Sequence, residues 1–127
     1  MVRDGERGAA AVEFALVVPL LLLLVMGIVE FGRAYNAQTT ISGAAREGVR
    51  VMALRNDPAA AKAAVKSAAS PIQLSDAQIS ISPTSCTSSG STPQTATVTV
   101  TYKVDFLTGL LGAGVTLTGK GVMRCNG

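Results

Sequence analysis

The chain has 127 residues, 48% of them hydrophobic, and its eleven basic and eight acidic side chains give a net charge of +3. The basic residues are dispersed, and two tyrosines and three phenylalanines without any tryptophan cannot form a base-stacking surface, which argues against a nucleic-acid-binding protein. There is no histidine, and Cys86 and Cys125 do not form a closely spaced pair, so we expect no metal site and no other cofactor.

The first predicted element is a transmembrane helix over residues 9–31. Sixteen residues without a charge run from Phe14 to Val29. Extended back to Ala9, the run spans about 31 Å as a helix, close to the hydrocarbon thickness of a bilayer. It is longer than the apolar core of a signal peptide and no small-x-small cleavage site follows it, so we expect a retained helix.

The orientation of this helix follows from the cysteines, because the flanking Lys and Arg residues are nearly balanced. Cys86 and Cys125 both come after the apolar run, and a disulfide between them needs an oxidising compartment. The alternative is two unpaired thiols. With a disulfide, the N-terminus lies inside and the C-terminal part lies outside the cytoplasmic (inner) membrane.

The helix is expected to continue beyond the membrane, over residues 32–56. Apolar residues recur there with a helical period, and Ala44 and Gly48 form a small-xxx-small pair that would let another helix approach closely. The periodic residues are Ile41, Ala45, Val49 and Met52. Asp57 and Pro58 then predict a helix break, an N-cap and a second helix from Pro58 to about Ala69.

Three strands are predicted in the C-terminal part: Ala77–Ser82, Thr95–Phe106 and Val115–Cys125. The second has strict alternation of apolar and polar residues, and the glycines of the third suggest an irregular or bulged strand. The two helices are the natural cover for the apolar face of this sheet. The apolar linker from Phe106 to Gly114 either caps the sheet or touches the membrane. The fold class is therefore α+β.

Two residues in the apolar helix are unusual. Glu13 places a carboxyl group near one end of the spanning segment, where it costs free energy unless it is solvated at the headgroup level or has a partner. Pro19 removes one backbone hydrogen bond and favours a kink. The remaining carboxylates are scattered, no histidine is present to activate a serine, and no glycine-rich phosphate loop occurs, so we expect neither an enzyme nor a small-molecule substrate.

The segment around Glu13 resembles the processing motif of type IV pilin-like proteins. Its sequence from Arg7 is RGAAAVEF, in which Glu13 is the fifth residue after Gly8 and Phe14 follows it. The longer stretch from Gly8 to Arg50 resembles the TadE-like family of pseudopilins, the minor pilins of Tad/Flp (type IVc) pili. It carries EFALV and a proline before the leucine run, GIVEFGR at the end of that run, and AAREGVR further along.

The resemblance implies a set of properties. A prepilin peptidase would cut between Gly8 and Ala9, so that residues 1–8 are a leader, 9–31 the transmembrane segment, 32–56 the exposed continuation of the helix and 57–127 an extracytoplasmic pilin-like domain. Glu13 and Phe14 would act in assembly. The partners would be the membrane, the peptidase, other pilins or pseudopilins, and inner-membrane platform proteins.

The function expected from these features is that of a minor pilin that takes part in the assembly or anchoring of a Tad-type pilus, in the membrane or within a cell-surface filament. The alternative is an uncleaved, single-pass, membrane-anchored surface binding module. The two differ in the mature N-terminus, which would be Ala9 in the first case and Met1 in the second.

Overall fold

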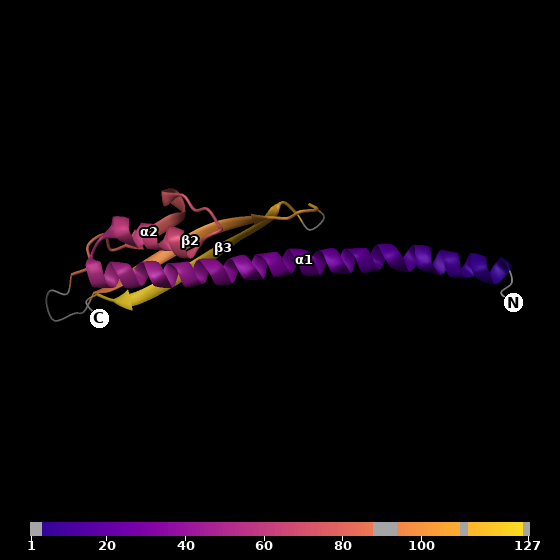
Figure 1. Cartoon of the computed structure of the whole chain (residues 1–127), viewed down its shortest axis with the longest axis horizontal. Helices are drawn as coiled ribbons and strands as arrows, with labels where there is room; N and C mark the ends of the chain where they lie inside the picture. The colour runs from indigo at the N-terminus through magenta and orange to yellow at the C-terminus, as the bar shows by residue number, and fades with distance from the viewer. Residues whose placement is uncertain (1–3, 88–93, 110–111, 126–127) are drawn as a thin grey trace. The chain divides into compact units, whose positions relative to one another are not determined.

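The computed structural model describes residues 4–87, 94–109 and 112–125 (Figure 1). In chain order the elements are α1 (Asp4–Arg55), α2 (Pro58–Ala68), a 3-10 turn (Asp76–Gln78), β1 (Ile79–Ser82), β2 (Thr95–Asp105) and β3 (Gly114–Arg124). This is the expected α+β, pilin-like fold of a long N-terminal helix, a short second helix and a three-stranded antiparallel sheet. The chain divides into two compact units, one ending at Arg33 and one beginning at Ala34.

The first unit is the N-terminal part of α1. The helix contains an 18-residue window with a mean hydropathy of 2.7, none of which is buried within the chain. Its length and composition are those of a helix that can cross a membrane. Pro19 lies inside the continuous helix, and residues 1–3 of the predicted leader lie outside the described residues.

The break between α1 and α2 has a local cause. Asn56 adopts a left-handed backbone conformation (φ 50°), and its N–H donates to the Met52 carbonyl at 3.0 Å, which ends α1. The Asp57 carboxylate then accepts hydrogen bonds from the first free N–H groups of α2, at 3.1 and 3.2 Å. Pro58 occupies the first turn of α2, so the predicted N-cap and restart are confirmed.

The sheet has the order β1-β2-β3, with both pairs antiparallel. The register of β2 and β3 is unbroken from Thr95 opposite Arg124 to Asp105 opposite Gly114. The predicted bulge in β3 is therefore wrong. The first strand is also shorter than predicted, because the 3-10 turn takes up Ala77 and the strand begins at Ile79.

The core of the second unit lies between the sheet and its helical cover. The four periodic positions of α1 are fully buried, as the pattern predicts: Ile41, Ala45, Val49 and Met52. Ala61 and Val65 of α2 and Val98 and Val100 of β2 join them. The core is built of small and β-branched side chains, so the backbones of these elements lie close together.

Glycines at three positions make this close packing possible. A Cβ atom built on Gly119 or Gly121 of β3 would lie 2.7 Å from backbone atoms of Ile41 or Ala45, respectively. A Cβ atom on Gly48 would lie 2.2 Å from Cγ2 of Val65. The two β3 glycines therefore allow β3 to pack closely on α1. The helix that approaches the predicted small-xxx-small pair, Ala44 and Gly48, is α2 of the same chain.

Candidate functional site

The predicted processing and assembly residues all lie in the first turns of α1. The side chains of Glu13 and Phe14 are exposed, with Phe14 at 71%. Ala9 precedes Glu13 by four residues, which is about one helical turn and places both on the same side of the helix. The predicted residues therefore lie along one exposed stretch of α1.

Gly8 itself lies inside a helix, because α1 begins at Asp4. A Cβ atom built on Gly8 would meet nothing within 4 Å. Glycine in a helix interior costs about 0.5–1 kcal/mol relative to alanine. The packing of the described residues therefore does not require a glycine at this position.

The distal end of the apolar run carries a charged pair. The carboxylate of Glu30 lies 3.8 Å from the guanidinium of Arg33, one turn later in α1. Glu30 is 1% exposed. From the sequence we expect Glu30 only to end the apolar run, and no sequence pattern indicates that its side chain is buried.

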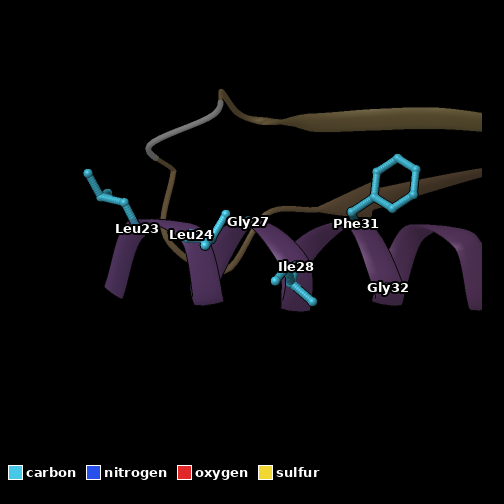
Figure 2. A pocket seen from close by; sticks show the side chains of 6 residues that line it. All are labelled: Leu23, Leu24, Gly27, Ile28, Phe31 and Gly32. Atoms are coloured by element: carbon cyan, nitrogen blue, oxygen red, sulfur yellow. The ribbon is translucent and has the colours of Figure 1, made fainter. Parts of the chain in front are cut away.

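A shallow apolar groove lies along α1 and extends past Glu30 to Gly32 (Figure 2). Figure 2 shows the side chains of Leu23 and Phe31 projecting from the helix, with Gly27 between them along the chain. The groove is lined by Leu23, Leu24, Gly27, Ile28, Phe31 and Gly32. Every lining side chain is apolar or absent, so the groove suits acyl chains or another apolar helix and holds no group that could do chemistry.

The predicted disulfide between Cys86 and Cys125 is present, with 5.4 Å between the two Cα atoms. Backbone hydrogen bonds hold both cysteines: the Cys86 N–H donates to the side-chain oxygen of Asn56, and the Cys125 N–H donates to the Gln94 carbonyl at 2.8 Å. The disulfide therefore joins the end of β3 to the loop that follows β1, and the Cys86 N–H connects that loop to the turn after α1.

One ion pair of the second unit links α2 to the 3-10 turn before β1. Lys66 of α2 forms an ion pair with Asp76. The hydrogen bond from Lys66, together with its positive charge, holds the pKa of the Asp76 carboxyl below its ordinary value of 3.8. In the described part of the chain, no three His, Cys, Asp or Glu side chains gather closely enough to hold a metal ion.

Comparison with known proteins gave one match. The searches of curated proteins and of solved structures each found no match. Residues 8–50, which contain the exposed start of α1, its apolar run and the glycine that receives α2, match the model of one protein family. That family is described as TadE-like protein, and residues 8–50 of the chain are similar to it.

Proposed function

We propose that the chain is a minor pilin, or pseudopilin, that a prepilin peptidase cuts between Gly8 and Ala9 and that then takes part in assembling or anchoring a Tad-type pilus. The match of residues 8–50 to the TadE-like family supports a Tad pilus-associated protein. The observation that carries the finer proposal is Glu13, an acidic residue five positions after a glycine in an otherwise apolar, exposed helix.

In this proposal α1 anchors the chain in the cytoplasmic membrane, with the N-terminus inside and the second unit outside. The unburied apolar window of α1 supports the span. The disulfide supports the outside location of the second unit, because such bonds persist in oxidising compartments. The proposed partners are the peptidase, other pilins or pseudopilins, and inner-membrane platform proteins.

Glu13 has a physical role in this scheme. Cleavage would leave the α-amino group of Ala9, whose ordinary pKa is about 7.7–8.0, at the membrane edge. A neighbouring subunit shifted along the helix axis can place its own amine against Glu13. Burying either charged group alone in lipid costs free energy. An ion pair between them would reduce that cost for both and fix the axial stagger of the two subunits.

The first experiment determines the mature N-terminus by mass spectrometry of the protein purified from membranes that contain the pilus machinery. We expect a chain that begins at Ala9. A chain that begins at Met1 would contradict the processing step and leave the anchored surface module as the better interpretation.

The second experiment replaces Glu13 with alanine. The variant should insert into the membrane normally, because the change makes the helix more apolar, but it should be lost from sheared or detergent-extracted pilus assemblies. Glu47→Ala, which removes an exposed acid of α1 outside the apolar run, is the matched control and should assemble normally. Normal assembly of Glu13→Ala would refute the pairing.

A further inference from the structure

The inference concerns the loop that joins β2 to β3 and rests on the membrane span proposed above. The sequence of this linker, FLTGLLGAG from Phe106 to Gly114, leaves two possibilities, a cap on the sheet or a contact with the membrane. Residues 110–111 lie outside the described residues, whereas Leu107 is described. Its side chain belongs to a large apolar residue that is 63% exposed.

The direction of β3 relative to α1 places this loop within the second unit. Gly119 meets the backbone of Ile41, and Gly121 meets the backbone of Ala45. Two strand residues and four helix residues each cover about 6–7 Å, so the two elements run side by side in the same direction. The residues of β3 before Gly119, and Asp105 of β2 opposite Gly114, therefore lie toward the Ala34 end of the unit.

The opposite end of the unit is identified independently. There the Asn56 side chain accepts a hydrogen bond from Cys86, and Cys86 is bonded to Cys125 just beyond the end of β3. The loop and the disulfide thus mark the two ends of the same sheet. Only the loop end is the end at which α1 enters the unit.

Ala34 comes three residues after Phe31, where the apolar part of α1 ends. If that part spans the bilayer, the Ala34 end of the second unit lies at the membrane surface by chain connectivity alone. Tyr35, which is 69% exposed, lies at this same end. Aromatic residues with a polar tip are enriched at the headgroup level of membranes.

We propose that Leu107, just after β2, makes a second membrane contact by inserting into the interfacial region of the outer leaflet of the bilayer. The occupant of this surface is lipid. At the level of the headgroups, Leu107 would bury its exposed side chain in the bilayer. The charged residues that precede it in β2, Lys103 and Asp105, would remain in water. Two contacts would fix the tilt of the sheet on the membrane, where a single helix leaves it free to turn.

Tryptophan fluorescence tests this proposal directly, because the native chain contains no tryptophan. The full chain carrying Leu107→Trp is reconstituted into phosphatidylcholine vesicles, with and without bromine on the acyl chains. The matched control is Leu54→Trp, at a leucine of similar exposure, 59%, near the opposite end of the unit. A non-reducing gel verifies that each variant has formed the disulfide.

We expect Leu107→Trp to emit at shorter wavelength than Leu54→Trp and to be quenched several-fold more strongly by the brominated lipid. A third variant, Leu22→Trp in the apolar part of α1, separates this proposal from the span on which it rests. If Leu22→Trp is quenched but Leu107→Trp and Leu54→Trp show the same emission wavelength and the same quenching, the Leu107 contact is overturned and the span is left intact. Absence of quenching in Leu22→Trp would overturn both.

Discussion

The close approach of α1 and β3 predicts that Gly121→Ala destabilises the second unit. The added Cβ atom would lie 2.7 Å from the Ala45 carbonyl oxygen and 3.0 Å from the Cα atom of Arg46. Both are backbone atoms of a helix, so no side-chain rotation relieves the overlap, and α1 must move away from the sheet. Overpacking of this kind costs about 1–3 kcal/mol. Replacing a strand glycine returns about 0.5–1 kcal/mol, which leaves a net loss of about 1–2 kcal/mol.

Pulse proteolysis of the full chain in vesicles across a urea series measures this loss, because it reports the folded fraction of the exposed unit. The midpoint should fall by about 1 M, given a typical urea dependence for a small domain. Gly43→Ala is the matched control: it lies on the exposed side of α1, where a Cβ atom would meet nothing within 4 Å. That variant should gain up to about 1 kcal/mol from helix propensity. If Gly121→Ala were as stable as Gly43→Ala, the packing of α1 on β3 described above would be wrong.

Three further predictions concern the second unit. Replacing both Cys86 and Cys125 with serine should lower the free energy of unfolding by about 4 kcal/mol, because the chain between them is freed in the unfolded state; an unchanged urea midpoint would contradict this. Asp57→Ala should cost about 1 kcal/mol by removing the N-cap of α2, seen as loss of hydrogen-exchange protection in its first turn and not elsewhere. The depressed pKa of Asp76 stabilises the fold fully above pH 3.8, and this contribution is lost as the pH falls through the lower folded value. The stability difference between wild type and Asp76→Asn should therefore shrink on acidification below pH 3.8, and a difference independent of pH would refute the role of the Lys66 ion pair.

The elements that the sequence predicts well are those whose signal is local and repeated. The alternation in β2 needs no knowledge of its partners, and the structure ends that strand one residue before the predicted Phe106. The break at Asp57 and Pro58 depends on side chains that cap their own helix, so it too can be predicted from neighbouring residues.

The elements that the sequence predicts poorly depend on tertiary partners. A glycine in a strand can indicate either a bulge or a close approach of another backbone, and the sequence does not distinguish the two. At Gly119 and Gly121 the close approach of α1 is the cause. Ala77 alternates correctly for a strand, but the Gln78 side chain accepts a hydrogen bond from the Ser75 N–H at 2.8 Å and closes a turn instead. The candidate site is predicted from a resemblance, since the exposure of Glu13 and Phe14 alone does not distinguish an assembly residue from one that faces lipid.

The parallel course of α1 and β3 has a mechanical consequence. A pulling force applied along α1 from its N-terminal side would load the contacts at Gly119 and Gly121 together, in shear, because helix and strand run side by side. Separation by peeling would have to begin at one end of the sheet, and at the end remote from the load the Cys86–Cys125 bond ties the strand to the chain. The unit is thereby suited to bear tension along α1 while the sheet stays packed on the helix.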